Sequence, residues 1–278
     1  MKMRDIKEIM GFGVAGNFAG HLEQAGEASD FIGLKREIGA PKGIFPYYVP
    51  NATSFLSKAC VDNEKIIIPL NTNVQVEPEI AVRFELSYDK NTHEITDLTP
   101  LSFMAFNDAS VRGIKAPKIS HKKNFGDASK GAGNEISIDK FSKGGICDDF
   151  SLASFLKRGD EILPYGECAM LSSYGYFYEK LLSWLKDTLN TQHDEAVLEN
   201  LSELFKIANY PKQIIISLGA TRYAPNMQNA YLQDGDEVFI IAFNHKKYNL
   251  EQIIKLIKDS KISANDDISV LNQRVQTL

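Results

Sequence analysis

The stretch NVQVEPEIAVRFEL, residues 73–86, decides the fold because its apolar residues alternate for most of its length. One side of the alternation carries Val76, Pro78, Ile80 and Val82, and the other carries Gln75, Glu77, Glu79 and Ala81. Successive side chains of a strand point to opposite faces, so the pattern predicts a strand with both glutamates on one face. Pro78 cannot donate to a sheet ladder and must lie at an edge, at a bulge or at the start of the strand.

Further strands and helices are predicted around this stretch. Short apolar runs typical of strands are KIIIPL (65–70), SFMAFNDAS (102–110), QIIISLG (213–219) and DEVFIIAF (236–243). Helical spacing of apolar residues covers 176–190, 195–208 and 249–260, the last with Asn249 as a cap. The interval 115–133 is predicted to be mainly loop. We therefore expect a β-rich α+β fold in a single domain over residues 1–278, with a helical insertion at about 176–210.

The composition excludes several classes of protein. Of 278 residues, 44% are hydrophobic and 24% are charged, which is typical of a globular chain. A net charge of −5 without a basic stripe gives no footprint for nucleic acid. The three cysteines lie far apart, the N-terminal MKMRDIKEIM lacks the apolar core of a signal peptide, and no apolar run is long enough to cross a bilayer. We expect a cytoplasmic enzyme or binding protein that binds neither nucleic acid nor membrane.

The run GFGVAG, residues 11–16, matches the G-x-G-x-x-G fingerprint of dinucleotide-binding folds. Such a site also needs a long helix after the glycines and an acidic residue at the end of a second strand. Gly20 and Gly26 interrupt the residues that follow, and Asp30 comes too early and follows no strand. The run therefore favours a glycine-rich backbone turn, and a nucleotide-dependent oxidoreductase stays as the weaker alternative.

Glu77, Glu79 and Asp108 form the most informative set of acidic residues. Two glutamates at i and i+2 on one strand face project in parallel and can bind one hard cation. Asp108 follows an apolar run in FNDASVRG, where its side chain can complete the set. The alternative for the two glutamates is a solvated strand face. Because crowded carboxylates repel one another without a metal, we expect Asp108→Ala to abolish tight metal binding and leave the fold largely intact.

Several segments resemble the fumarylacetoacetate hydrolase family, and they do so in the family's order. VEPEIAV resembles its E-x-E-x-A-V strand, FNDASVR its N-D segment, GNFAGH its N-Y-x-x-H and KKNFG its K-S-F-D. LPYGECAMLSSYGYFYEKLLSWL, IISLGAT and QDGDEVFI resemble its hairpin with the following helix and its closing strands. The resemblance covers about residues 11–243 and implies a mixed β-sandwich roll with a few peripheral helices.

The resemblance also implies a metal centre. Its ligands would be Glu77, Glu79 and Asp108, and its metal would be Mg2+ or Mn2+, with Ca2+ able to replace them in crystals. A homodimer and a small keto acid as the partner molecule are implied in the same way. A hard cation held by carboxylates keeps positions open for substrate and water.

Catalytic and substrate-binding residues follow from the same motifs. His21 would be the base that activates water, and Lys123 would stabilise negative charge, unless the neighbouring Lys122 takes that place. Arg112 would either hold a substrate carboxylate or pair with a ligand carboxylate. The remaining substrate contacts would come from Asn17, Gly219 and Thr221.

Departures from the family pattern fall around the expected substrate and spare the metal set. Gln24 stands where the family has the glutamate that partners the lid histidine, and an amide cannot stabilise an imidazolium as a carboxylate does. Lys115 replaces a frequent glutamine, and Gly219-Ala220-Thr221 replaces G-T-P. We expect a metal-dependent hydrolase or decarboxylase of a β-keto acid or acylpyruvate. The alternative is a non-catalytic, metal-containing protein that binds a small acid.

Overall fold

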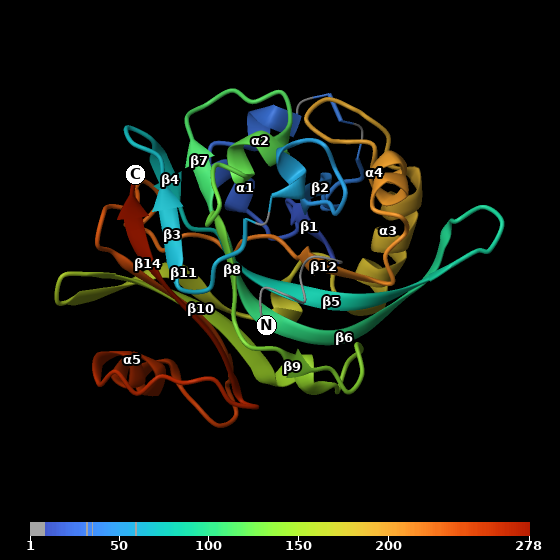
Figure 1. Ribbon diagram of the computed structural model, residues 1–278. Coiled ribbons are helices and arrows are strands. Elements are labelled where there is room, and N and C mark those ends of the chain that lie inside the picture. The colour runs from blue at the N-terminus through green and yellow to red at the C-terminus, as the bar shows by residue number, and fades with distance from the viewer. Residues whose placement is uncertain (1–8, 32, 35, 59) are drawn as a thin grey trace.

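The structure is a computed structural model that describes residues 9–31, 33–34, 36–58 and 60–278. Residues 1–8, on which the expectation about a signal peptide largely rests, lie outside the described residues. Within the described ranges the strands form a seven-stranded sheet, a five-stranded sheet and a two-stranded ribbon (Figure 1). The expected β-rich α+β fold is thereby confirmed.

The first sheet carries the stretch with which the sequence analysis began. Its order is β2 (Gly43–Tyr48), β1 (Met10–Ala15), β12 (Gln213–Ser217), β5 (Pro78–Tyr88), β6 (Ile95–Asp108) and β8 (Lys130–Ala132), with β9 (Ile136–Ser137) also paired to β6. β1 and β12 are parallel, and the other neighbours are antiparallel. Pro78 is the first residue of β5, where its missing N–H costs no ladder bond.

The second sheet packs against the first. Its order is β11 (Glu161–Met170), β10 (Phe150–Arg158), β13 (Glu237–Asn244), β14 (Ile268–Thr277) and β3 (Lys65–Ile68). The KIIIPL run is therefore a strand, as predicted, and it pairs in parallel with β14. The ribbon consists of β4 (Asn73–Gln75) and β7 (Ser110–Arg112).

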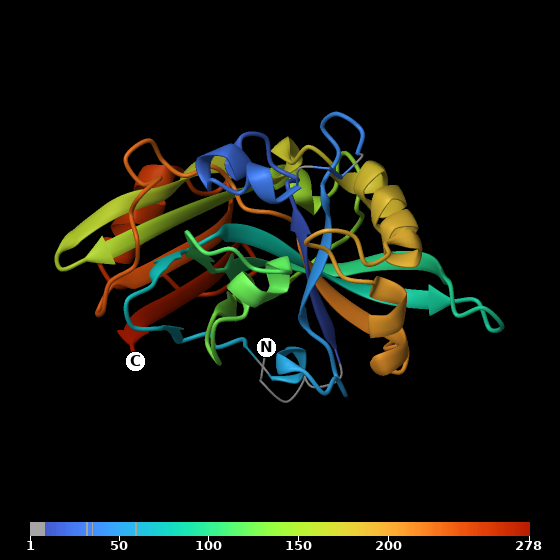
Figure 2. The same ribbon diagram turned by 90° about the horizontal axis from the view of Figure 1, so that it is seen from above.

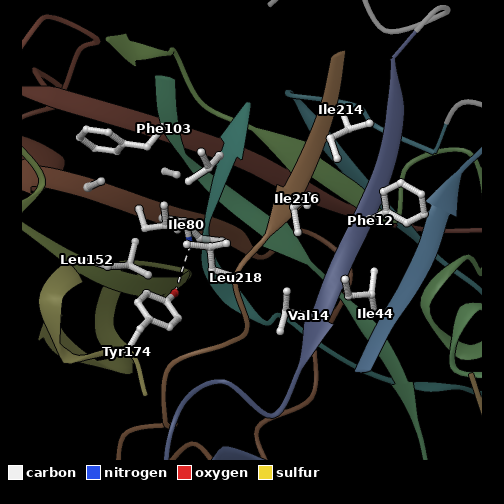
Figure 3. Packing of buried hydrophobic residues seen from close by; sticks show 14 of the residues in the cluster. Phe12, Val14, Ile44, Ile80, Phe103, Leu152, Tyr174, Ile214, Ile216 and Leu218 are labelled. Carbon is white, nitrogen blue, oxygen red and sulfur yellow. Dashed lines mark hydrogen bonds between the residues drawn. The ribbon is translucent and has the colours of Figure 1, made fainter. Parts of the chain in front are cut away.

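The two faces of β5 have different neighbours, as the alternation predicts. Ile80 and Val82 belong to the main apolar cluster, which also takes Phe103 from β6 and Leu152 from β10 (Figure 3). Ala81 belongs to a separate cluster on the opposite face. Glu79 has the same parity as Ala81, so its side chain leaves the sandwich core and points to that second face.

The helices pack against different parts of the sheets: Ile253 and Ile257 of the last helix contact the outer face of β10 and β13. They are α1 (His21–Gln24), α2 (Ile119–Lys123), α3 (Tyr178–Thr191), α4 (Leu201–Ile207) and α5 (Leu250–Lys258), with 3-10 turns η2 (Ala28–Phe31), η3 (Phe55–Ser57), η4 (Ile146–Asp149) and η5 (Leu171–Ser173). Figures 1 and 2 show α3 and α4 together at one end of the molecule and α5 at the other. Asn249 caps α5 in a capping box, as predicted.

Two element predictions are wrong in detail. The helix predicted over 195–208 begins only at Leu201, because Glu195 and Leu198 exchange backbone hydrogen bonds of 3.2 and 2.9 Å and close a turn first. Ala196 in that turn has φ 49°, which interrupts helical geometry. The interval 115–133, predicted to be loop, contains α2 and β8.

Among the described residues, no helix is both long and apolar enough to span a bilayer.

The glycine run forms the buried strand β1 and the turn after it. A Cβ atom on Gly11 would lie 2.0 Å from the Tyr47 ring, and one on Gly13 would lie 2.3 Å from the Phe45 ring. Only glycine therefore admits these aromatic residues of β2 so close to the backbone of β1. The helix that follows, α1, has 4 residues, too few for the crossover helix of a dinucleotide fold.

Candidate metal centre and active site

The acidic residues Glu77, Glu79 and Asp108 converge at one end of the first sheet. Glu79 lies in β5 and Asp108 ends β6, and Asp108 N donates to the Glu77 carbonyl at 3.1 Å. The three side chains offer ligand oxygens that lie within 4.8 Å of one another. Their exposed fractions are 4%, 2% and 0%. The prediction that these carboxylates meet is borne out by the geometry, and the solvated strand face is wrong.

Glu77 is surrounded by cationic groups. Arg112 Nη2 donates to its Oε1 at 2.7 Å, and Lys123 Nζ donates to its Oε2 at 2.5 Å. Burial opposes ionisation, but Lys123 and Arg112 outweigh it and hold the pKa of Glu77 well below its ordinary value. Glu77 is therefore an ionised carboxylate in a buried position.

Asp108 is held between two lysines. Lys123 Nζ donates to its Oδ2 at 2.7 Å, and Lys130 Nζ lies 2.9 Å from its Oδ1. Lys130 is fully buried and also donates to the carbonyls of Ala109, at 3.2 Å, and of Lys123. It thus binds a candidate ligand and the end of the helix that carries Lys123. The sequence analysis missed Lys130, since a lysine at the start of a three-residue strand gives no periodic signal.

Glu79 differs from its two neighbours because no ion pair with it is found among the described residues. Its Oε2 accepts a hydrogen bond from Gly219 N at 2.8 Å. Burial, together with the charges of Asp108 and Glu77, raises the pKa of Glu79 well above its ordinary value. Within the described part of the chain, Glu79 is thus a buried carboxylate without a cationic partner, and Glu77, Glu79 and Asp108 offer only oxygen ligands. Such a set fits a hard divalent cation.

His21 is the first residue of α1 and is buried beside the acidic set. Its Nδ1 lies 2.9 Å from the carbonyl of Thr221, which can only accept, so Nδ1 carries the hydrogen. Nε2 lies 3.7 Å from Glu77 Oε2 and has no hydrogen-bond partner among the described residues. The backbone of Thr221 thus orients the imidazole.

Gln24 stands where the fumarylacetoacetate hydrolase pattern has a glutamate that partners the lid histidine, and its side chain binds the backbone of Tyr223 instead. Its Oε1 accepts from Tyr223 N at 2.8 Å, and its Nε2 donates to Tyr223 O at 3.4 Å. These bonds attach α1 to the segment that follows β12. The imidazole of His21 takes its orientation from the Thr221 carbonyl instead.

Residues 17–31, here called the lid segment, place a further carboxylate in the site. Glu27 is buried, pairs with Arg112, and lies 2.9 Å from Lys122 Nζ. Asp30 Oδ2 lies 2.5 Å from the same Lys122 Nζ. Burial opposes ionisation, but Arg112 outweighs it and lowers the pKa of Glu27. The sequence analysis did not single out Glu27 as a site residue.

Consecutive lysines of α2 have separate partners. Residues that follow one another in a helix point about 100° apart, so Lys123 reaches the acidic set while Lys122 reaches the lid segment. The structure therefore places Lys123, and not Lys122, beside the candidate ligands. Arg112 pairs with the candidate ligand Glu77, as one of its two alternatives predicted.

The residues predicted to contact substrate, Asn17, Gly219 and Thr221, form hydrogen bonds to other residues of the protein. Asn17 uses both side-chain amide atoms on the backbone of Tyr176, at 3.0 and 2.8 Å. Gly219 contacts Glu79 through its N–H, and Thr221 contacts His21 through its carbonyl, so both act here as backbone partners of site residues. Lys115 is exposed to solvent.

A small cavity lies next to the acidic set. Its volume is about 20 Å3, and its walls include His21, Leu22, Glu27 and Phe31 of the lid segment. One water molecule needs about 10–15 Å3 measured in this way. The closed site therefore has room for an ion or a water molecule and not for a small organic acid.

Comparisons with known proteins identify the sequence family. The profile of a family of unknown function (DUF5718) matches residues 27–275. The chain belongs to the DUF5718 family. A comparison with curated protein sequences gives no match. The matched range contains the acidic set and every lysine and arginine that contacts it, whereas His21 precedes it.

Solved structures show which fold this DUF5718 chain has. The apo form of 2-keto-3-deoxy-D-arabinonate dehydratase matches with a TM-score of 0.54 at 13% identity, covering 100% of this chain and 82% of that one. A fumarylacetoacetate hydrolase family protein from Yersinia pestis CO92 matches with a TM-score of 0.52 at 13% identity, covering 96% and 93%. A 5-carboxymethyl-2-hydroxymuconate delta-isomerase from Mycobacterium smegmatis gives 0.51 at 16%, covering 97% and 79%. The DUF5718 chain therefore has the fumarylacetoacetate hydrolase fold.

Proposed function

We propose that the protein is a metal-dependent enzyme that cleaves a β-keto acid or an acylpyruvate, by hydrolysis or by decarboxylation. The observation that carries this proposal is the convergence of Glu77, Glu79 and Asp108 beside Lys123 and His21. Support also comes from a protein of the same fold, a 2-keto-3-deoxy-D-arabinonate dehydratase complexed with magnesium and 2,5-dioxopentanoate.

The acidic residues would hold Mg2+ or Mn2+ through one oxygen each. When bound, such a cation supplies Lewis-acid stabilisation of the oxygen that becomes negative when a carbon–carbon bond breaks. Lys123 lies between Glu77 and Asp108, so its ammonium would neutralise the same negative charge from the protein side. Burial of these groups strengthens their interactions with a reacting acid.

His21 would act as the base for a hydrolytic reaction. Its Nε2 would accept a proton from water as the water oxygen adds to the acyl carbonyl carbon. The bond between that carbon and the neighbouring methylene then breaks, and its electron pair enters an enolate, which takes the proton to give the keto acid. Decarboxylation breaks the bond to the carboxylate carbon without water, so it does not need this base.

The proposal is tested in two steps with the full chain. Isothermal titration with Mn2+ should give saturable binding at one site per chain, and Glu79→Gln should weaken it by about a hundredfold, since it removes a ligand charge. A panel of acylpyruvates and oxaloacetate in the presence of Mg2+ is then assayed for acid products and for carbon dioxide.

His21→Gln distinguishes the two reactions. Hydrolysis should fall by about a hundredfold or more, because a general base contributes on that scale, while decarboxylation should persist. Metal binding and acid binding without turnover of any panel member would favour the non-catalytic acid-binding alternative. Absence of Mn2+ binding would refute both.

A further inference from the structure

The buried carboxylate of Glu27 is the feature of the site that the proposed chemistry does not use. It is 7% exposed and comes from the lid segment, whereas its partners Arg112 and Lys122 come from β7 and α2. The side chains of Arg112 and Lys122 are 5% and 6% exposed. Two buried cations therefore converge on one carboxylate that belongs to a separate segment of the chain.

The two cations would change most if the lid segment moved away. Lys122 is paired with Glu27 at 2.9 Å and with Asp30 at 2.5 Å, and both carboxylates belong to the lid segment. Arg112 keeps Glu77, Gln75 and Tyr223 as partners but uses its Nη1 on Glu27. Displacement of the lid segment thus frees one face of Arg112 and the ammonium of Lys122 together.

The closed cavity requires such a displacement before an organic acid can enter. Its volume of about 20 Å3 holds a water molecule or an ion, and Leu22, Glu27 and Phe31 of the lid segment line it. Outward movement of the lid segment alone would leave Lys122 without either of its carboxylates and Arg112 without one of its two. An unpaired buried charge costs several kcal/mol. An incoming carboxylate can offset that cost, because it offers the same two oxygens as Glu27.

We propose that Arg112 and Lys122 form a carboxylate-binding subsite, separate from the acidic set, which Glu27 fills in the closed state and which a carboxylate of the ligand takes over. Glu27 is then an internal competitor of the ligand, and exchange of one carboxylate for the other releases the lid segment. The inference rests on the proposed function only in that both place a small acid in this cavity.

With an internal competitor, the apparent association constant of the ligand equals its intrinsic value multiplied by the fraction of molecules whose subsite is free. Glu27→Gln removes the competing charge while keeping nearly the same shape. Succinate is a suitable probe, since it carries carboxylates but no oxo group for chelating a metal. Titration calorimetry of the full chain with Mg2+ present should give succinate binding about tenfold tighter, or more, for Glu27→Gln than for the original chain.

Matched variants locate the effect. Glu23→Gln makes the same change at an exposed carboxylate of the lid segment and should leave succinate affinity unchanged. Lys122→Gln combined with Glu27→Gln should remove the gain, since one cation of the subsite is lost. Unchanged or weaker succinate binding by Glu27→Gln would overturn the proposal.

Hydrogen exchange of the original chain gives an independent test, should Glu27→Gln fail to fold. Saturating succinate should speed amide exchange in residues 17–31, because the exchange of carboxylates releases this segment. Slower or unchanged exchange at saturation would overturn the proposal. Mn2+ titration reports separately on the candidate metal centre. If the chain does not bind Mn2+ but succinate still speeds amide exchange in residues 17–31, only the proposed function is contradicted.

Discussion

Two regions next to α2 bury carboxylates, and their surroundings give those carboxylates different properties. Glu77 and Asp108 lie among Arg112, Lys123 and Lys130. Glu199, in the turn before α4, accepts a hydrogen bond of 2.5 Å from Ser120, and its Oε2 has no partner. Burial raises the pKa of Glu199 from its usual value near 4.5 to about 7.

The comparison shows that burial of an acid, or a raised pKa, is a weak sign of function by itself. Glu199 has the perturbed pKa often found in active sites, yet it does not line the cavity beside the acidic set. The candidate metal centre is distinguished by convergence: carboxylates from two strands share one small volume, and lysines from α2 and β8 meet them there.

The largest effect is expected from Asp108→Ala. The variant leaves the ammonium groups of Lys123 and Lys130 without their shared carboxylate, so the free energy of unfolding should fall by about 3–5 kcal/mol. Mn2+ affinity should fall by at least about a hundredfold with the lost ligand. Urea unfolding and calorimetric titration measure the two changes.

This outcome differs from the expectation based on sequence alone. Mutual repulsion of the carboxylates suggested that the variant would leave the fold largely intact, whereas the structure shows Asp108 in ion pairs on both oxygens. Asp97→Ala, at an exposed position of the same strand, is the matched control and should change neither quantity. An Asp108→Ala protein as stable as the original would contradict the ion pairs described here.

A smaller, two-sided effect is expected from Lys130→Met. The metal-free protein should lose about 2–3 kcal/mol, because Asp108 loses an ion-pair partner and two buried carbonyls lose their donor. Mn2+ should bind about tenfold more tightly, since a positive charge beside a ligand has been removed. A purely structural lysine would give the loss of stability without the gain in affinity.

The control for this variant is Lys157→Met in β10. Lys157 forms a half-exposed pair with Glu237 at 2.8 Å, and such pairs contribute about 0–1 kcal/mol. Thermal unfolding with and without Mn2+ compares the two variants. Weaker Mn2+ binding by Lys130→Met would show that orientation of Asp108 outweighs the charge of the lysine.

The sequence predicts the candidate ligands because strand geometry is local. Parity places Glu77 and Glu79 on the face opposite Ile80, and the β5–β6 hairpin brings Asp108 to the same end of the sheet. The capped helix α5 was equally predictable, since its capping box lies within four residues. Short-range patterns therefore predict most of the architecture that supports the candidate metal centre.

The cationic half of the site depends on contacts that no local pattern encodes. Glu27 and Arg112 are 85 positions apart, and His21 and Thr221 are 200 apart. Lys130 reaches Asp108 only because β8 pairs with the end of β6, and β8 lies in an interval predicted to be loop. The resemblance to the fumarylacetoacetate hydrolase family gives the order of the motifs along the chain. It does not predict site residues that lie outside those motifs, such as Glu27 and Lys130.

The smallest effect, and the sharpest test of the comparison, is expected from Glu199→Gln. The folded-state pKa of Glu199 is raised to about 7, so between about pH 4.5 and pH 7 the unfolded chain binds fewer protons than the folded one. Stability from this group is therefore lost as the pH rises through that window. Lys118 favours its ionised form and Asp194 opposes it, but burial outweighs both.

Glu199→Gln removes the charge and keeps the acceptor for Ser120. The variant should be as stable as the original near pH 4 and more stable by about 1–2 kcal/mol at pH 8, as urea unfolding at the two pH values would measure. Mn2+ affinity should not change, because Glu199 contacts no residue of the acidic set. If Glu199→Gln and the original chain differ in stability by the same amount at both pH values, the carboxyl of Glu199 is solvated. Glu199 would then no longer serve as a buried carboxylate to compare with the candidate metal centre.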